Sequence, residues 1–387
     1  MAAILVAGAG ALDLGLLAVT LTLPRALFAW FGGGWVDRHR RRPVLIGADL
    51  VRAVALLAIP AAAYWHAMSM PLLYVIAATT GVATVLFELA DHVFIADLVG
   101  REQLLDANGK REAVDAIAEI SGPALGGALV AWLTAPIAIA VDALTFVASA
   151  LLIARIRTQE KIAAASAASS FVEDVRIGIH VVWRDPAIRA LFIAAAAMTL
   201  FGSFMASLYT LFALRDLGLT PTELGIAIGC GGIGAFAGAT MSGRAAQRFG
   251  PRRTLIGSLA LGAAMQVLIP LAPPIPWIAM TFLIATQVLG DGVLTIYLIN
   301  ETTLRQRLLP PEALGRAAGT FHVANGLLTP IGALAGAVLA ESIGIRPTLW
   351  LLAIGYAMAL VSLIFARRAL PVTTLLPTQL DPKAATR

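Results

Sequence analysis

The chain has 387 residues, of which 59% are hydrophobic and 13% are charged; its formal net charge is +5 and its mean hydropathy is +0.85. Ordinary soluble domains carry about 25% charged residues, so this composition excludes a soluble globular protein. The single cysteine, Cys230, excludes an intramolecular disulfide and a cysteine-based zinc cluster.

Long apolar runs such as VLIGADLVRAVALLAIPAAAYW set the architecture. They last about 20 residues, the length that an α-helix needs to cross a bilayer, and they lack the alternation of barrel strands. We therefore predict an all-α polytopic membrane protein. Its eleven expected spans cover residues 10–36, 43–64, 71–97, 110–133, 136–157, 189–213, 222–247, 253–271, 276–302, 315–340 and 345–367.

The basic residues sort by loop. Only Arg215 and Arg346 fall in the loops that we place outside, while Arg25 and Arg52 fall within spans; the other Lys and Arg residues lie on the opposite side. By the positive-inside rule that side is cytoplasmic. We therefore predict a multi-pass protein of the cell membrane with a cytoplasmic C-terminus. The positive charge is then a signal of topology and gives no support to a nucleic-acid partner.

Four segments follow from these spans: a transmembrane bundle at 1–157, a cytoplasmic linker at 158–188, a second bundle at 189–368 and a cytoplasmic tail at 369–387. In the linker, Ser170 and Glu173 have the spacing of a helix capping box. Apolar residues then recur at helical spacing, which predicts a short amphipathic helix. This helix would lie on the membrane surface or pack on its own bundle.

The two bundles are copies of one unit. GGWVDRHRRRPVLIG from Gly33 resembles GRAAQRFGPRRTLIG from Gly243, an offset of 210 residues. Under this offset the span at 189–213 has no counterpart at the start of the chain, so the first span of a twelve-span pattern is largely missing. We favour a start codon assigned too late over a truncation or a natural eleven-span variant.

The first of these loop segments resembles the signature G-x-L-A-D-R-x-G-R-R of the major facilitator superfamily. The matching residues are Gly33, Asp37, Arg38, Arg41 and Arg42, whereas Trp35 replaces the usual Leu and Arg40 the usual Gly. The wider sequence, including LGRAAGTFHVANGLLTPIGALAGAVLAESIG, looks like the branch of siderophore exporters and macrolide efflux proteins. The resemblance implies two pseudo-symmetric helical bundles that transport by alternating access.

The resemblance also implies a gate at this loop. Asp37 would contact the end of the span near 315, and Arg38 or Arg41 would contact an acid such as Asp97. The second copy carries Gln247 where an acid would sit, beside Arg248, so its latch is expected to be weaker. The alternative is that these arginines only anchor the cytoplasmic side.

A second motif, GPALGG, resembles the antiporter signature of the fifth span, which implies export coupled to proton entry. Its residues are Gly122, Pro123, Gly126 and Gly127. The proline is expected to kink the helix, and the glycines to let a neighbouring backbone approach closely. A packing face of small residues would give the same pattern.

Ionisable residues inside a bilayer are costly and therefore candidates for function. Arg25 follows Pro24 in mid-span, and Asp291 lies near the centre of its span; Glu88, Asp91 and His92 share a third span. One of the carboxylates would load and release a proton, with Arg25 as counter-charge or substrate anchor. Alternatively, Arg25 pairs with Glu88 or Asp91 and only fastens two helices. Asp49 and Arg52, three residues apart, predict a local ion pair.

These features favour a secondary transporter that exports a hydrophobic or amphipathic small molecule, such as a drug, macrolide or siderophore, in exchange for protons. The alternatives are an importer of the same fold and a membrane scaffold or receptor that transports nothing. We expect no enzyme activity, cofactor or metal, and a monomer in the lipid bilayer. The run GCGGIGAFAG from Gly229 lacks the lysine of a phosphate-binding loop and predicts helix packing.

Overall fold

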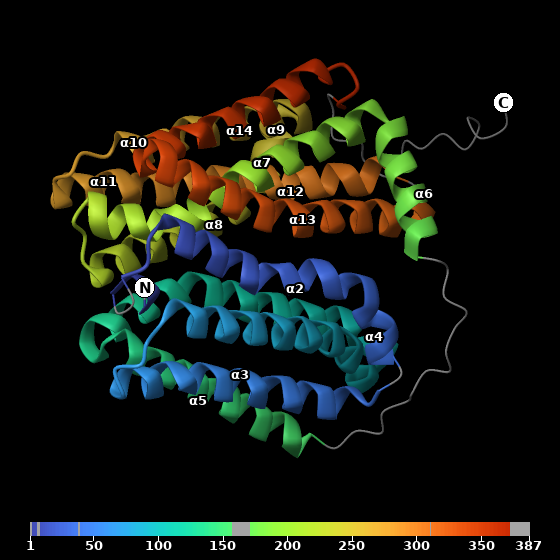
Figure 1. The fold of residues 1–387 in the computed structure, drawn as a ribbon. Helices are drawn as coiled ribbons and strands as arrows, with labels where there is room; N and C mark the ends of the chain where they lie inside the picture. The colour runs from blue at the N-terminus through green and yellow to red at the C-terminus, as the bar shows by residue number, and fades with distance from the viewer. Residues whose placement is uncertain (1, 6–7, 38, 157–170, 310, 372–387) are drawn as a thin grey trace.

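The computed structural model describes residues 2–5, 8–37, 39–156, 171–309 and 311–371; for 25–37 and most of 92–131 it describes the backbone alone. All the regular elements in these ranges are helical. They form two bundles that lie one above the other (Figure 1), with α6 at one end of the molecule. We call this end the α6 end. The predicted all-helical fold of two bundles is confirmed.

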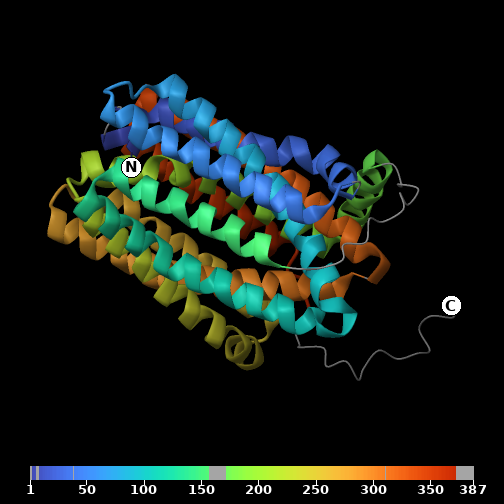
Figure 2. The ribbon, with the colours of Figure 1, turned by 90° about the horizontal axis from the view of Figure 1, so that it is seen from below.

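The first bundle contains α2 and the helices up to α5, preceded by one helical turn. The bounds are α1 (Ala2–Leu5), α2 (Ala11–Asp37), α3 (Arg41–Tyr64), α4 (Met70–Leu133) and α5 (Ala135–Arg155). Seen from below, α5 runs between α3 and the later part of α4 (Figure 2).

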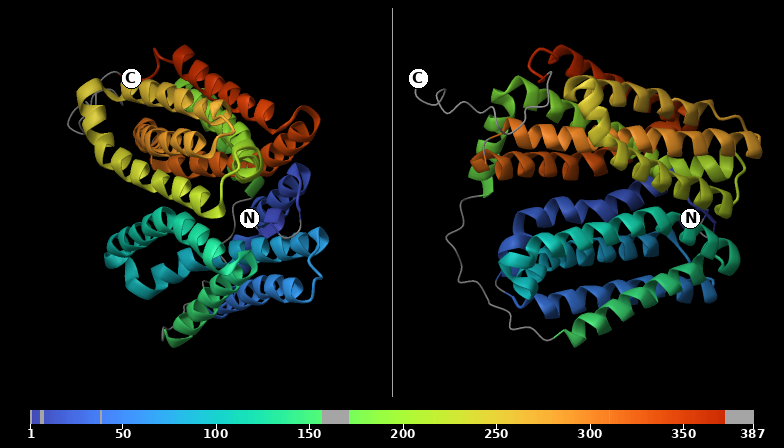
Figure 3. Two further views of the ribbon diagram at one scale, coloured as in Figure 1. Left: turned by 90° about the vertical axis from the view of Figure 1, so that its left-hand side faces the viewer. Right: turned by 180° about the vertical axis from the view of Figure 1, so that it is seen from behind.

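The helix α4 differs from the prediction. We expected two spans joined by a loop over 98–109, but the backbone is helical through all 64 residues of α4. A straight helix of this length would measure about 96 Å, so α4 doubles back near the α6 end into two arms (Figures 1 and 3). The segment REQLLDANGKREAVD is polar but rich in residues that favour helices. The loss of hydropathy therefore marks a membrane boundary and not the end of a helix.

The second bundle contains the remaining elements. Their bounds are α6 (Phe171–Arg184), α7 (Pro186–Leu211), η1 (Phe212–Asp216), α8 (Pro221–Phe249), α9 (Pro251–Gln266), α10 (Leu268–Leu271), α11 (Pro276–Ala285), η2 (Thr286–Gly290), α12 (Asp291–Leu308), α13 (Pro311–Ile343) and α14 (Ile345–Phe365). Two π-helical turns are present: η1 ends the helix that begins as α7, and η2 lies between α11 and α12. Such turns are rare and occur frequently at functional sites.

Helix starts in the second bundle follow from local chemistry. Helix α7 begins with Pro186, and the Asp185 carboxylate before it accepts hydrogen bonds from the next free backbone amides. Proline suits this position because its missing N–H would have no partner there. Thr220 and Glu223 form a complete capping box at the start of α8. Gly250, with φ of +80°, makes the sharp turn between α8 and α9.

The outer surface is apolar. Val54, Trp132 and Phe236 are among the large hydrophobic side chains that are mostly exposed, as lipid contact requires. In the part of the chain that the structure describes, nine helical segments are long and apolar enough to cross a membrane. The other two of the eleven expected spans correspond to α2, with its apolar segment Ala11–Pro24, and to the second arm of α4.

The two bundles meet along α2 with α13 and along α4 with α8. Within the first bundle α3 packs on α5, and within the second α9 packs on α14. The predicted linker helix is present as α6, and its Val182 is fully buried in the hydrophobic core of the second bundle. The helix therefore packs on its own bundle. Ser170 of the predicted capping box and the tail from 372 onward lie outside the described residues.

The glycine run of α8 forms a tight seam with η2 and α12, as predicted. A Cβ added at Gly234 would lie 2.8 Å from the carbonyl carbon of Val288, and one at Gly238 would lie 2.8 Å from the carbonyl carbon of Gly292. Contact between carbon atoms is optimal at about 3.5–4.0 Å. Only hydrogen side chains allow this approach.

Both bundles contain such an approach at corresponding positions. In the second bundle, a Cβ at Gly231 of α8 would overlap the carboxylate of Asp291 in α12. In the first bundle, a Cβ at Gly81 of α4 would lie 2.5 Å from the carbonyl oxygen of Leu21 in α2. The offset of 210 residues places Leu21 on Gly231 and Gly81 on Asp291. The glycine has therefore changed helices between the two copies.

Candidate functional site

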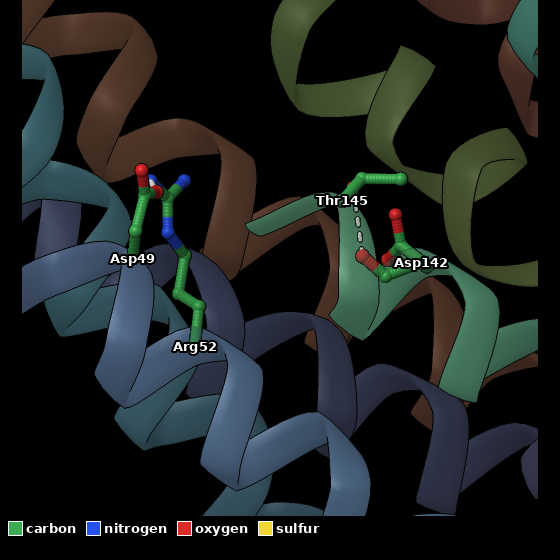
Figure 4. A network of polar contacts seen from close by, with 4 residues as sticks. All are labelled: Asp49, Arg52, Asp142 and Thr145. Carbon is green, nitrogen blue, oxygen red and sulfur yellow. Dashed lines mark hydrogen bonds and ion pairs between the residues drawn. The ribbon is translucent and has the colours of Figure 1, made fainter. Parts of the chain in front are cut away.

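A charge cluster lies within the first bundle, centred on the buried Arg52 of α3. Arg52 is 8% exposed and forms an ion pair with Asp49, which is 1% exposed. Figure 4 shows the guanidinium folded against Asp49 on the same helix. The predicted local ion pair is confirmed. The second carboxylate oxygen of Asp49 is buried without a hydrogen-bond partner among the described atoms.

Two further helices complete this environment. The guanidinium carbon of Arg52 lies 4.5 Å from the ring centroid of Phe87 in α4 and 4.4 Å from that of Phe146 in α5. Glu88 in α4 and Asp142 in α5 also interact with it electrostatically. Arg52 is therefore held between two aromatic faces with a carboxylate on each of three helices around it. We call Asp49, Arg52, Glu88 and Asp142 the Arg52 cluster.

The relation of Asp142 to Arg52 was not predicted from the sequence. Asp142 lies on α5, and its carbonyl accepts a hydrogen bond of 2.7 Å from the Thr145 hydroxyl on the same helix (Figure 4). Its carboxyl group interacts with Arg52 only because α5 packs on α3. The available signal was the depth of Asp142 in its span, since an acid there is costly.

A second polar cluster surrounds Asp291, the first residue of α12 after the π-helical turn η2. Its carboxylate packs against the backbone of Gly231 and interacts electrostatically with Tyr209 of α7 and Tyr356 of α14. Gln266 of α9 is a further polar neighbour of Tyr356. Both tyrosines and the glutamine are buried. The structure thus gives Asp291 polar neighbours from three other helices.

An unpredicted ion pair lies further along α12 toward the α6 end. Arg305 Nη1 lies 3.6 Å from Glu301 Oε1, and the Arg305 guanidinium carbon lies 4.3 Å from the ring centroid of Phe321 in α13. Under the offset of 210 residues, Glu301 corresponds to Asp91 of the first bundle. Asp91 is half-buried. Both copies therefore carry an acid at this level of the helix.

The arginines of the loop before α3 have separate environments. Arg41 is 2% exposed, whereas a residue that only anchors the membrane surface would be solvated. Arg42 binds the end of α5: its Nε donates to the Ile153 carbonyl at 3.2 Å, and its Nη2 donates to the Ala154 carbonyl. Helix carbonyls at this end lack partners within the helix.

The equivalent residue of the second bundle makes the same kind of contact. Arg252, at the offset of 210 from Arg42, donates from Nη1 to the Arg367 carbonyl just beyond α14, at 3.2 Å. Each copy thus uses one loop arginine to hold the end of its own last helix. Gln247 and Arg248 are exposed at the end of α8, where the Arg248 guanidinium lies over the Phe249 ring at 5.6 Å.

Several predicted site residues have no described side chain. Arg25, Gly33 and Asp37 lie on α2 as backbone, and His92, Asp97, Pro123 and Gly127 lie on α4 in the same way; Arg38 lies outside the described residues altogether. The predicted contacts of Arg25 with Glu88 or Asp91, and of Arg38 or Arg41 with Asp97, thus remain predictions. Among the described residues, no group of three potential metal ligands is present.

At Gly122 and Gly126, the two described glycines of the GPALGG motif, the expected close approach is not observed. A Cβ at Gly122 or Gly126 would meet no atom within 4 Å, and Gly122 is exposed. Both glycines lie on the second arm of α4, on faces that no described helix covers this closely. Close approaches that need glycine occur elsewhere, for example at Gly81, Gly234 and Gly238.

Comparisons with known proteins identify the family. The family model described as transmembrane secretion effector matches residues 2–383. The multidrug efflux pump Tap of Mycolicibacterium fortuitum is 30% identical over 371 residues, which cover 92% of this chain and 86% of that protein. Macrolide efflux protein A of Streptococcus pyogenes is 23% identical over 346 residues, which cover 88% of this chain and 84% of that protein.

Solved structures support the same fold. A bacterial homologue of the iron transporter ferroportin, in its inward-facing state, has a TM-score of 0.72 at 19% identity and covers 94% of this chain and 92% of that chain. The nucleoside transporter NupG has a TM-score of 0.72 at 12% identity, with 95% of this chain and 92% of that chain covered. The chain therefore belongs to the transmembrane secretion effector family of the major facilitator superfamily, and it is a multi-pass membrane transporter.

Proposed function

We propose that this transporter resides in the cell membrane and exports a hydrophobic or amphipathic small molecule, driven by proton entry. Direction and substrate class are supported by the two relatives named for multidrug and macrolide efflux. The observation that carries proton coupling is the Arg52 cluster, because charged groups inside a membrane protein are rarely retained without a role in transport.

The geometry of the cluster suggests how a proton would be coupled to movement. Asp49 is fixed to Arg52 on the same helix, whereas Glu88 and Asp142 reach it from α4 and α5. In a medium of low dielectric, the attraction between opposite charges falls steeply as they separate. A shift of α4 relative to α3 would weaken the hold of Arg52 on Glu88, and the carboxylate would then take up a proton. The reverse shift would release it.

Asp291 is the second candidate carboxylate. It lies directly after the π-helical turn η2 and beside Tyr209 and Tyr356, in the interior of the other bundle. The tyrosines combine an apolar ring with a polar hydroxyl, which suits contact with an amphipathic substrate. We assign Asp291 and its tyrosines to substrate binding and the Arg52 cluster to the proton.

The loop before α3 is proposed as the gate at the α6 end, which we assign to the cytoplasm. The burial of Arg41 supports this role, because a solvated anchor would not need to bury its guanidinium. Arg42 is hydrogen-bonded to the end of α5 and would fix the position of the loop relative to its own bundle. The weaker latch of the second copy, at Gln247 and Arg248, is consistent with the exposure of both residues.

Transport assays distinguish the proposed export from two other functions. An importer of the same fold would accumulate substrate on the opposite side of vesicles of known orientation. A scaffold or receptor would show no substrate-dependent flux. The efflux names of the relatives favour export.

Glu88→Gln in proteoliposomes tests the proposal. A macrolide or a fluorescent cationic drug serves as the probe. We expect the variant to lose transport driven by an imposed pH gradient and to keep exchange of substrate across the membrane without a gradient. This result follows because the variant removes only the carboxyl group that would bind the proton. Glu341→Gln, an exposed acid on α13, is the matched control and should behave as wild type. Unchanged gradient-driven transport after neutralising Glu88, Asp91 and Asp291 would exclude proton coupling through these acids.

A further inference from the structure

A groove lies between α3 and the first arm of α4, near the α6 end, where Figure 1 shows these two helices side by side. Its volume is about 800 Å³, which is within the range of sites for ligands of moderate size. Val44 and Val51 of α3 form one wall, and Val82 and Leu86 of α4 form the other. Val51 is 45% exposed, as is typical of a side chain that faces lipid.

The groove is apolar along its whole length except at one end. Thr79 carries the hydroxyl group of the wall, and this hydroxyl donates to the Val75 carbonyl of its own helix at 2.8 Å. The hydrogen of this hydroxyl is thus engaged within its own helix, and the valine and leucine side chains of the two walls offer only hydrocarbon. A hydrocarbon chain fits the groove, because both apolar walls offer van der Waals contact along its length.

The end of the groove is cationic. His39 and Arg40 lie at this rim and are both exposed. Arg41 is buried and Arg42 holds the end of α5, so Arg40 is the loop arginine that faces the rim. Within the described part of the chain, the Arg40 side chain has no hydrogen bond or ion pair.

The second copy lacks this rim. At the offset of 210 residues, Phe249 replaces His39 and Gly250 replaces Arg40. The positive-inside rule asks for basic residues on one side of the membrane but does not require them at the end of an apolar groove. The combination of groove and cations is therefore a feature of the first bundle and not of the repeat.

From this arrangement we propose that the groove between α3 and α4 binds one anionic phospholipid, with an acyl chain along Val44, Val51, Val82 and Leu86 and the phosphate at Arg40 and His39. Juxtamembrane basic residues attract anionic headgroups, and the groove supplies a surface for the chain directly beneath them. The occupant comes from the leaflet at the α6 end.

Gly47 provides a specific test. It lines the groove, and a Cβ added there would meet no atom within 4 Å. Gly47→Leu therefore places in the groove a side chain whose Cβ displaces no protein atom, and it replaces glycine by a better helix former. Gly257 corresponds to Gly47 at the offset of 210 residues and also has no atom within 4 Å of an added Cβ. Gly257→Leu is thus the matched control.

The experiment is native mass spectrometry of the full chain in detergent, with dioleoyl phosphatidylglycerol and dioleoyl phosphatidylcholine added in turn. Wild type and Gly257→Leu should retain one phosphatidylglycerol in preference to phosphatidylcholine. Gly47→Leu should lose this binding at least tenfold while its melting temperature stays at or above that of wild type. Arg40→Ala should weaken phosphatidylglycerol about fivefold, which corresponds to about 1 kcal/mol for one basic residue, and leave phosphatidylcholine unchanged.

Three results would overturn the proposal. Equal retention of the two lipids by wild type would exclude recognition of the anionic headgroup. Wild-type binding by Gly47→Leu would place the lipid elsewhere. An equal loss of phosphatidylglycerol in Arg253→Ala, which removes an exposed arginine of the second bundle at the same end, would mean that overall charge and not the groove attracts the lipid.

Discussion

The close packing of α8 against α12 predicts that a glycine-to-alanine substitution has opposite effects on stability at two positions of α8. Gly238 and Gly243 both lie on α8. Alanine favours a helix over glycine by up to about 1 kcal/mol at either position. At Gly243 an added Cβ meets no atom within 4 Å, so Gly243→Ala should stabilise the protein by about 0.5–1 kcal/mol.

At Gly238 the added Cβ would lie 2.8 Å from the carbonyl carbon of Gly292 and closer still to its oxygen. Contact at about 3.5–4.0 Å requires α12 to move away by roughly 1 Å, and the obstructing atoms are backbone that cannot rotate aside. Overpacking of this kind costs about 1–3 kcal/mol, which outweighs the gain in helix propensity. The gain in helix propensity is common to both positions, so we expect Gly238→Ala to be less stable than Gly243→Ala by the cost of overpacking, about 1–3 kcal/mol.

Thermal unfolding of both variants in one detergent, followed by tryptophan fluorescence, measures the difference. Gly243→Ala should unfold at or above the wild-type temperature and Gly238→Ala several degrees below it. Equal melting temperatures for the two variants would refute the close approach of α8 and α12.

Two further predictions concern the buried arginine and the loop arginines. Arg52→Met should lower the free energy of unfolding by about 3–5 kcal/mol, because it leaves the Asp49 carboxylate buried without its ion pair. The double variant Asp49→Leu with Arg52→Met should recover most of that loss. A double variant as unstable as Arg52→Met alone would contradict this account. Arg42→Ala should increase hydrogen exchange at the end of α5 and leave α14 unchanged, and Arg252→Ala should do the reverse. If either variant raised exchange at the ends of both α5 and α14, the contacts would not be confined to their own bundles.

The sequence predicted the features that depend on local pattern. Hydropathy identified the spans, the offset between Gly33 and Gly243 identified the repeat, and a spacing of three residues identified the pair of Asp49 and Arg52. The glycine run of α8 was assigned to packing because it lacks a phosphate-binding lysine, and its close contacts with η2 and α12 agree. Each of these inferences uses residues that are neighbours in the chain or related by one fixed offset.

Other features depend on contacts between distant segments, and single-sequence reasoning could not place them. Glu88 interacts electrostatically with Arg52 because α3 packs on α4, whereas its predicted contact with Arg25 remains a prediction. Asp142 joins the same cluster through the packing of α3 on α5. The loop expected at 98–109 is helical, since polarity and helix propensity diverge where a chain leaves the membrane.

The exchange of glycine between the two copies has a consequence for how the halves diverged after duplication. What both copies preserve is the spacing of a helix pair, at Leu21 with Gly81 and at Gly231 with Asp291, and not the identity of the residue that permits it. The glycine that allows this spacing can lie on either helix of the pair. In the second bundle, glycine on α8 leaves the facing position on α12 open to a side chain, and this position carries the carboxylate of Asp291. In the first bundle the facing position is Gly81 itself, which has no side chain. The same helix spacing thus places a polar group at the seam of one half only.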